Sequence, residues 1–191
     1  SLELNHDEIL GLVGDNCAGK STLIKIISGV FQPTEGEIFL KNKKVKIRTP
    51  KEAKKLGIET VYQDLALADN LDIARNIFVG KELIKPGCVS KLLKIVDKRK
   101  MWDESKKILH NLGIEIESTK ILVRNLSGGQ RQSVAVGKTL YANPEIIIMD
   151  EPTAAVSVKE REKILNLIEN LKEKHISIIF ISHNLQEIFS V

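Results

Sequence analysis

The sequence predicts an α/β fold with a mostly parallel sheet, a small antiparallel β part at the N-terminus and an inserted α-helical subdomain. Three short apolar segments predict the sheet, because each is followed by polar or glycine residues and then by a helical pattern. Continuous apolar runs suit strands that helices cover on both faces, and strand–helix alternation joins parallel strands by right-handed crossovers. The middle of the chain, in contrast, carries helical patterns and no convincing strand.

The expected buried strands span residues 8–13, 145–149 and 176–181, and a fourth candidate spans residues 58–62. Their lengths are those of strands rather than of helices. Because the carboxyl ends of parallel strands meet at one edge of a sheet, we expect the residues that directly follow these strands to lie close together.

Helical patterns separate the strands. The segment after residue 19 places four large apolar residues on a helix, namely Leu23, Ile24, Ile26 and Ile27. Residues 158–174 carry one apolar face and are otherwise rich in Lys and Glu, which is typical of an amphipathic helix. The members of that face are Ile164, Leu165, Ile168 and Leu171.

Between Gln63 and Leu126 we expect helices at residues 71–79 and 100–112, with Pro86-Gly87 and Leu112-Gly113 as punctuation. The second helix has a stripe formed by Met101, Ser105, Ile108, Leu109 and Leu112. The chain is therefore expected to form a single domain. Its α/β core would comprise residues 1–64 and 133–191, and its helical subdomain residues 65–132.

Length and composition fit one globular domain that needs neither disulfides nor a structural metal. The chain has 191 residues, of which 42% are hydrophobic. Its longest apolar runs are strand-length, far below the roughly 18 residues that cross a bilayer. No signal-peptide pattern is present, so a cytosolic location is expected. Cys17 and Cys88 form no metal-binding or redox spacing.

The net charge of +4 is mild, and its most visible cluster lies at residues 41–48. Val45 and Ile47 alternate with basic residues there, which favours a solvated strand whose lysines protect a sheet edge. A nucleic-acid stripe is the alternative. No aromatic residue interleaves with the lysines, as single-strand binding would favour, so no nucleic-acid partner is expected.

A complete P-loop motif follows the first strand. Glycines let the backbone wrap closely around phosphates, and the following helix adds its positive N-terminus. In this pattern Lys20 reaches the β- and γ-phosphates, the Ser21 hydroxyl binds Mg²⁺, and Thr22 contacts the α-phosphate. A functionless glycine turn is the alternative, which the strand before and the helix after disfavour. The motif reads Gly14-Asp15-Asn16-Cys17-Ala18-Gly19-Lys20-Ser21-Thr22.

The P-loop is one anion-binding turn, or cradle. A second such cradle lies about a hundred residues further on, in a glycine turn at the start of a helix. One P-loop needs no second cradle to bind a nucleotide. The two motifs together therefore suggest an ATP site assembled from two copies of the protein. The second motif reads Leu126-Ser127-Gly128-Gly129-Gln130-Arg131-Gln132.

Two acidic residues end the apolar strand at residues 145–149. Asp150 is expected to hold Mg²⁺ through water, and Glu151 to polarise the attacking water, because phosphoryl transfer needs mainly positioning and charge neutralisation. A surface turn with two acids is the alternative, and the P-loop at the same expected edge argues against it.

Two further polar residues follow strands at this edge. His183 comes after residues 176–181 and is expected to bond the γ-phosphate or the attacking water. Gln63 ends the fourth strand, and its amide could contact Mg²⁺ and water in one state and withdraw in another. The alternatives are a satisfied polar histidine and a solvated loop glutamine. The other histidines, His6, His110 and His175, are taken as structural.

In order and spacing, these motifs resemble an ATP-binding cassette (ABC) ATPase over nearly the whole chain. The resemblance implies a P-loop NTPase (RecA-like) core, with ATP and Mg²⁺ as cofactors. It implies a head-to-tail dimer in which Ser127, Gly128, Gly129 and Gln130 act on the nucleotide held by the other subunit. It also implies that the helical insert and the Gln63 region contact membrane permease subunits, at the cytoplasmic face of the membrane.

Within that family four segments resemble importers of monosaccharides, which implies a substrate-binding protein as an indirect partner. They are Tyr62 to Ala66, Ile73 to Gly80, Gln130 to Ser133, and Pro152 to Glu160. Three alternatives stay open. They are an ABC ATPase of DNA repair, a translation-associated protein with two cassettes, and an inactive truncated fragment. Coiled-coil repair ATPases insert long segments between the Gln and LSGGQ positions, and only residues 64–126 separate them here.

The chain departs from the family pattern in several places. It starts at Ser1 and stops at Val191 inside a helical pattern, so we expect it to be cut at both ends, without the adenine-stacking aromatic residue and the last strands. The loop at residues 154–157 lacks the usual aspartate. Cys17 replaces a small inert residue, and a thiol beside a helix N-terminus and a lysine can have a lowered pKa. We therefore expect alkylation of Cys17 to block nucleotide binding.

Overall fold

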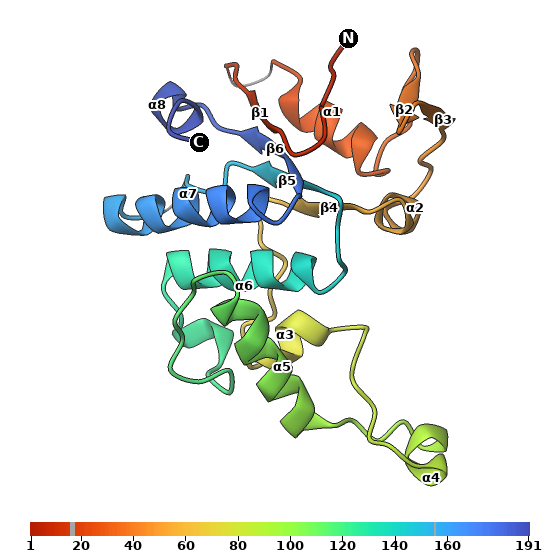
Figure 1. The fold of residues 1–191 in the computed structure, drawn as a ribbon, viewed down its shortest axis with the longest axis vertical. Coiled ribbons are helices and arrows are strands. Elements are labelled where there is room, and N and C mark those ends of the chain that lie inside the picture. Colours follow the sequence, from red (N-terminus) through yellow and green to blue (C-terminus); the bar gives the residue numbers. More distant parts are fainter. Residues whose placement is uncertain (16–17, 155) are drawn as a thin grey trace.

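A computed structural model describes residues 1–15, 18–154 and 156–191. Its centre is a four-stranded sheet in the order β1-β6-β5-β4, and each neighbouring pair is parallel (Figure 1). This sheet confirms the α/β prediction, and each strand lies within two residues of its expected bounds. The strands are β1 (Ile9–Leu12), β4 (Ile58–Val61), β5 (Ile146–Asp150) and β6 (Ser177–Ile181).

Helices cover both faces of this sheet (Figure 1). On one face lie α1 (Lys20–Ile27) and α2 (Pro50–Lys55), and on the other lie α6 (Gly128–Leu140) and α7 (Val158–Lys172). Alternate residues of the central strands pack against the two layers, because successive strand side chains point to opposite faces. Thus Ile147 and Met149 belong to the core with α6 and α7, whereas Ile148 belongs to the core with α1 and α2.

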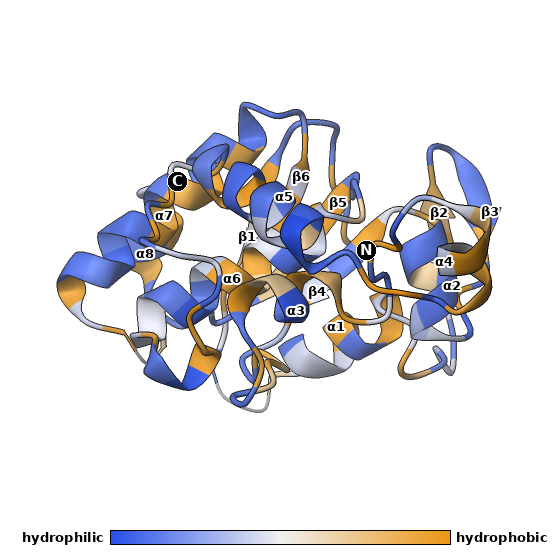
Figure 2. Cartoon of the chain, turned by 90° about the horizontal axis from the view of Figure 1, so that it is seen from below, coloured by the Kyte–Doolittle hydropathy of each residue, from blue (hydrophilic) through white to orange (hydrophobic). Residues whose placement is uncertain are grey.

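The amphipathic helices show hydrophilic and hydrophobic segments side by side (Figure 2). In α7 the residues Ile164, Leu167, Ile168 and Leu171 are buried, as the apolar face predicted. In α1 only Ile24 is fully buried. The other apolar residues of α1, Leu23, Ile26 and Ile27, are half-buried, so this helix is less enclosed than its composition suggested.

The basic segment at residues 41–48 contributes to a separate antiparallel hairpin of β2 (Ile38–Leu40) and β3 (Lys43–Val45). Lys43 and Lys44 are exposed, whereas Ile47 is buried. The lysines thus lie on a solvated two-stranded edge, and the hairpin is the small antiparallel part that the sequence predicted.

The middle of the chain is helical and has a hydrophobic core of its own. The helices α3 (Ile73–Phe78) and α5 (Lys98–His110) pack with α6, and a short 3-10 helix η1 (Val123–Asn125) precedes α6. The stripe on α5 is buried at Met101, Ser105 and Leu109. Helix α6 passes through residue 132, the expected boundary of the subdomain, and packs against both cores. The boundaries of the subdomain stay a prediction.

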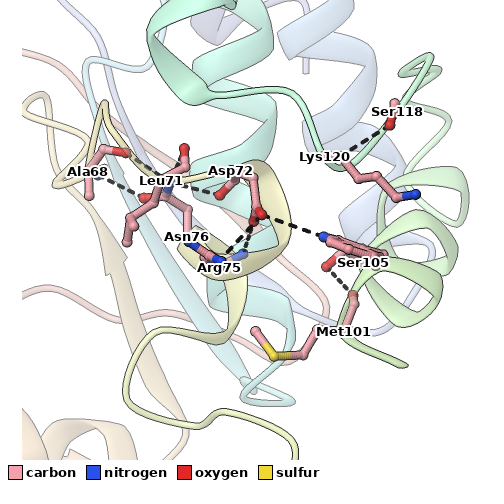
Figure 3. Close-up of polar contacts among 10 residues, drawn as sticks. Ala68, Leu71, Asp72, Arg75, Asn76, Met101, Ser105, Ser118 and Lys120 are labelled. Carbon is pink, nitrogen blue, oxygen red and sulfur yellow. Dashed lines mark hydrogen bonds and ion pairs between the residues drawn. The ribbon is translucent and has the colours of Figure 1, made fainter. Parts of the chain in front are cut away.

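A buried polar network supports the start of α3 (Figure 3). Asn76 is 1% exposed, and its Oδ1 accepts from the N–H of Ala68 at 2.7 Å. Its Nδ2 donates to the carbonyls of Ala68 and Asp72, both at 3.0 Å. The Asp72 carboxylate caps α3 through the N–H of Arg75 at 2.7 Å, and its other oxygen accepts from Trp102 Nε1 at 3.5 Å. These bonds satisfy the loop backbone that would otherwise be buried without partners.

Two short helices complete the fold. In chain order, α4 (Cys88–Leu92) comes after α3 and before α5, and α8 (Leu185–Ile188) follows β6. Ile188 of α8 packs against the core formed by α6 and α7. In the parts of the chain that the structure describes, every helix is too short or too polar to traverse a lipid bilayer.

Candidate functional site

The P-loop connects the edge strand β1 to α1. Gly19 has a left-handed backbone with φ of 89°, and Lys20 is the first residue of α1. The Lys20 ammonium folds back over the loop, where it donates to the carbonyl oxygens of Gly14 and, at 2.8 Å, of Asp15. Asn16 and Cys17 lie outside the described residues, so the expected alkylation of Cys17 stays a prediction. The loop therefore places a cation at the start of α1.

The N-terminus of α1 differs from that of the longer helices. Side chains of Asp97, Ser127 and Ser157 cap α5, α6 and α7, whereas no side chain among the described residues caps α1. The first N–H groups of a helix need an acceptor and favour negative charge. Ser21 and Thr22 in this first turn are exposed. The arrangement is therefore suited to bind an anion such as a phosphate.

Asp150 and Glu151 leave β5 at the same edge. The Asp150 carboxylate makes no hydrogen bond or ion pair within the described residues. Burial raises the pKa of Asp150, the charge of Glu151 raises it further, and the nearby Lys20 lowers it. An acceptor of this kind suits a cation. One carboxylate, the Ser21 hydroxyl and the Gln63 amide together fit Mg²⁺, which keeps several waters and takes further oxygens from phosphates.

Glu151 and His183 lie next to each other, although they follow different strands. His183 Nδ1 is 3.6 Å from Glu151 Oε1, and the N–H of Glu151 donates to the carbonyl of Ile181 at 3.0 Å. Glu151 has a φ of 48°, which is uncommon outside glycine and often marks a functional position. Its side chain is 19% exposed, and that of His183 is 63% exposed. The pair could hold a water molecule between a carboxylate and an imidazole.

Gln63 lies just beyond β4. Val61 pairs with Met149, so Gln63 leaves the sheet at the level where Glu151 follows β5. Its side chain is exposed. The structure therefore brings the P-loop, Asp150, Glu151, His183 and Gln63 to one edge of the sheet.

The LSGGQ turn begins α6 and contacts α7. Ser127 and Gln130 form a capping box, in which the Ser127 hydroxyl accepts from the N–H of Gln130 at 3.3 Å. The N–H of Gly129 donates to Glu160 Oε1 at 3.3 Å. Hydrogen bonds from Ser127, Ser157 and Gly129 lower the pKa of Glu160 to about 2. A Cβ on Gly129 would lie 2.9 Å from the Glu160 side chain, so a glycine is needed there.

The two cradles do not meet within one chain. No hydrogen bond or ion pair connects residues 127–132 with the P-loop residues that the structure describes. The reason lies in the topology, because α1 and α6 cover opposite faces of the sheet (Figure 1). The P-loop and the LSGGQ turn therefore precede helices of different layers.

The sequence did not reveal a buried cluster around Glu187. This residue is 5% exposed, and its Oε2 accepts from Thr153 Oγ1 at 2.6 Å and from Ser182 Oγ at 2.7 Å. Arg161 Nε of α7 lies 3.1 Å from Glu187 Oε1. The cluster thus connects the turn after Glu151, the residue before His183 and α7. No sequence pattern indicated it, whereas the pattern S-x-x-E at residues 157–160 could have indicated the Glu160 cap.

A pocket of about 190 Å³ lies beyond Gln63, between the end of β4, α3 and α6. Within it Glu59 is 4% exposed and pairs with Lys54 at 2.9 Å. Lys138 donates to the carbonyl of Ala66 at 3.1 Å, and burial lowers the pKa of Lys138. The pocket contains both apolar and charged groups, and the chain neighbours of Gln63, Tyr62 and Asp64, line it.

Comparison with known proteins gives one consistent result. A family model described as ABC transporter matches residues 1–154. The chain is 48% identical over 191 residues to the xylose/arabinose import ATP-binding protein XylG of Sulfolobus acidocaldarius, and covers 73% of it. It is 45% identical over 190 residues to the fructose import ATP-binding protein FrcA of Rhizobium meliloti, again covering 73%. A ribose import ATP-binding protein RbsA of Caldanaerobacter subterraneus is 42% identical, and the chain covers 37% of it.

Solved structures agree with this result. A nucleotide-free ATP-binding cassette from an ABC transporter superposes with a TM-score of 0.83 at 27% identity, covering 98% of this chain and 75% of that one. A dimeric ATP-binding cassette bound to ADP and Pi superposes with a TM-score of 0.77 at 27% identity, covering 97% and 79%. The fold around the candidate site is therefore that of a nucleotide-binding cassette.

Proposed function

The chain belongs to the ABC transporter family, and we propose that it is the ATP-binding and ATP-hydrolysing subunit that powers import of a monosaccharide. As an ATP-binding protein of this family it is an ATPase. The proposal of a monosaccharide is supported by relatives named for import of xylose and arabinose, fructose and ribose. Which sugar is carried would depend on other subunits.

We propose that the P-loop holds the phosphates of ATP. Lys20 would exchange its loop carbonyls for the β- and γ-phosphates, and the uncapped N–H groups of α1 would bond phosphate oxygens. Ser21, Gln63 and Asp150 would hold Mg²⁺, which supplies charge neutralisation at the phosphates. The raised pKa of Asp150 is consistent with a carboxylate placed to receive a cation.

The catalytic residues would be Glu151, His183 and Gln63. Glu151 would orient and polarise the attacking water, and His183 would contact that water or the γ-phosphate. Their separation of 3.6 Å supports joint action on one small group. Gln63 would complete the site when the helical insert moves towards the core.

The single observation that carries this proposal is the separation of the two cradles on opposite faces of one sheet. Structures of a solved cassette with this fold are described as dimeric, which supports a dimer here. We propose that Ser127, Gly128, Gly129 and Gln130 of one subunit complete the ATP site of the other, in a head-to-tail dimer.

Membrane permease subunits are the partners that an import ATP-binding protein implies. We propose that they contact the helical insert and the pocket beyond Gln63, which places the chain at the cytoplasmic face of the membrane as a peripheral subunit. A substrate-binding protein would act indirectly, through the permease. No nucleic-acid partner is proposed.

A trapping experiment tests the shared site. In Glu151→Gln, ATP should bind without turnover and hold a dimer that light scattering detects. Adding Ser127→Arg to this variant should prevent the dimer, whereas Ser118→Arg elsewhere in the insert should not. A Glu151→Gln protein that stays monomeric with ATP, or a dimer indifferent to Ser127→Arg, would contradict the shared site.

A second experiment tests the importer role. The protein is reconstituted with its permease and binding protein, and ATP hydrolysis is measured with xylose, arabinose, fructose, ribose or a disaccharide. We expect one of the monosaccharides to stimulate hydrolysis and the disaccharide to have no effect. If none of the monosaccharides stimulated ATP hydrolysis, the proposal of monosaccharide import would be contradicted. The assignment as an ATPase would not be affected.

A further inference from the structure

The connection between α3 and α5 forms a projection that stands apart from the rest of the chain (Figure 1). Its two arms run antiparallel, with a bridge between Ile84 and Val96. The N–H of Lys85 donates to the carbonyl of Ile95 at 2.9 Å, and the N–H of Asp97 donates to the carbonyl of Leu83 at 2.7 Å. These bonds hold the end of the projection, residues 85–95 with α4, away from the helical core. We refer to residues 85–95 as the α4 tip.

The α4 tip exposes large apolar side chains. Val89 is 66% exposed, Leu92 83%, Leu93 65% and Ile95 40%. None of them belongs to a hydrophobic core among the described residues. Single exposed apolar residues are ordinary, but four of them within seven positions form a patch that indicates an interaction site.

The surroundings of the tip are strongly basic. Residues 81–100 contain six lysines and Arg99 against only Glu82 and Asp97, a net charge of +5. The whole chain carries +4, so all other residues together carry −1. Lys85 and Lys94 of the tip are exposed. The chain thus has a second basic segment besides residues 41–48, and this one carries the exposed apolar projection.

We propose that the α4 tip binds the anionic surface of a lipid bilayer, with Leu92 and Leu93 entering the headgroup region and the lysines contacting lipid phosphates. Apolar side chains flanked by Lys and Arg favour this environment, because burial of the apolar groups and attraction to anionic lipids act together. Its biological setting rests on the proposed function, which places the chain beside a membrane. The contact would help to hold the subunit at the membrane independently of the nucleotide.

The charge also argues against a second copy as the occupant. A symmetric contact would bring two tips of like charge together, and such repulsion opposes association. A permease loop could cover an apolar tip, but the basic excess specifically favours a densely anionic partner. Both alternatives are outcomes of the test below.

The test uses sedimentation with phosphatidylcholine vesicles that do or do not contain phosphatidylglycerol, without permease or nucleotide. We expect the protein to bind the anionic vesicles and to be released by salt. Lys85→Gln and Lys94→Gln should each weaken binding about fivefold. The double variant Leu92→Ser, Leu93→Ser should weaken it by about tenfold or more.

Matched controls come from the β2–β3 hairpin. Lys43→Gln and Lys44→Gln remove exposed charges, and Phe39→Ser removes an aromatic side chain that is 59% exposed. These variants should bind vesicles as the unchanged protein does. Equal losses in the controls and in the tip variants would mean unspecific attraction and would overturn the proposal.

Two other results would also overturn it. One is binding of the tip variants to anionic vesicles at full strength. The other is that the tip variants lose self-association, or lose permease binding in detergent, while they still bind anionic vesicles as the unchanged protein does. ATP hydrolysis and the melting temperature should stay unchanged in all these variants, since none of them lies in the nucleotide site or a core. A failure of the lipid contact is thereby separated from a failure of the proposed ATPase site.

Discussion

Polar groups in the helical insert have hydrogen-bond partners, whereas several polar groups at the carboxyl edge of the sheet lack them among the described residues. In the insert, Asn76 is almost wholly buried and uses both ends of its amide in hydrogen bonds to backbone groups. At the edge, Asp150 is half-buried without a partner among the described residues, and α1 starts without a side-chain cap. Satisfied polar groups stabilise a fold, whereas unsatisfied ones at a sheet edge are available to a ligand.

The comparison extends to the backbone. Glu151 has a positive φ, and its side chain contacts the imidazole of His183 rather than a structural partner. In the insert Asp72 is a helix cap in an ordinary extended conformation. Strain at the edge is maintained by β5 and β6, the two central strands, which lie in register up to Asp150 and Ile181. The missing partners of Asp150 and the positive φ of Glu151 thus distinguish these two candidate site residues from the helix cap Asp72.

The largest expected effect is on turnover. Glu151→Gln should lower the rate of ATP hydrolysis by at least about a hundredfold, because it removes the group that polarises water, while ATP affinity is retained. Single-turnover hydrolysis and nucleotide binding are measured on the same sample. Glu173→Gln at the end of α7 is the matched control and should keep the rate. Rapid hydrolysis by Glu151→Gln would contradict the catalytic role proposed for this acidic residue at the sheet edge.

The next effect is on stability. Asn76→Ala should lower the free energy of unfolding by about 2 to 3 kcal/mol, because it leaves loop backbone groups buried without partners. Chemical denaturation measures this loss, and the exposed Asn111→Ala should cost less than about 0.5 kcal/mol. ATP affinity at the edge should change little. A stable Asn76→Ala protein with weakened ATP binding would show that the insert network serves the site instead.

A smaller effect, of opposite sign, is expected at Asp150. Its pKa is raised, so the ionised carboxylate costs stability in the fold, and that cost grows as the pH rises through the raised pKa. At neutral pH, Asp150→Asn should therefore raise the free energy of unfolding by less than about 1 kcal/mol and raise the melting temperature slightly. The same variant should lose Mg²⁺-dependent hydrolysis. The gap in melting temperature should close towards acid pH. A lower melting temperature at neutral pH would make Asp150 a structural residue.

The smallest effect concerns the LSGGQ turn. Glu160 has a pKa lowered to about 2, so its stabilising contribution is present above its ordinary pKa of 4.5 and is lost as the pH falls through about 2. Melting curves from neutral to strongly acid pH should show a loss in this window that Glu160→Gln reduces. The exposed Glu162→Gln should retain it. If Glu160→Gln and the unchanged protein lost stability identically towards acid pH, the contact of Glu160 with the LSGGQ turn would not contribute to stability.

The strands and the P-loop could be predicted because their signals are local. Apolar runs of strand length, followed by G-x-x-x-x-G-K-S or by Asp-Glu, are complete within about ten residues of sequence. The parallel arrangement then placed Asp150, Glu151 and His183 at one edge, as the structure shows. Their roles in catalysis, like those of the other candidate site residues, stay predictions.

The fold class, the polar residues that follow the strands and the two glycine-rich motifs could be predicted from the sequence alone. Three features became clear only from the packing of distant segments: α1 and α6 cover opposite faces of the sheet, Glu187 joins Thr153 and Ser182, and the α4 tip stands apart. The physical reason is range. A motif or an apolar period acts between neighbours along the chain, whereas burial of a carboxylate and exposure of a leucine depend on which distant segments pack beside them.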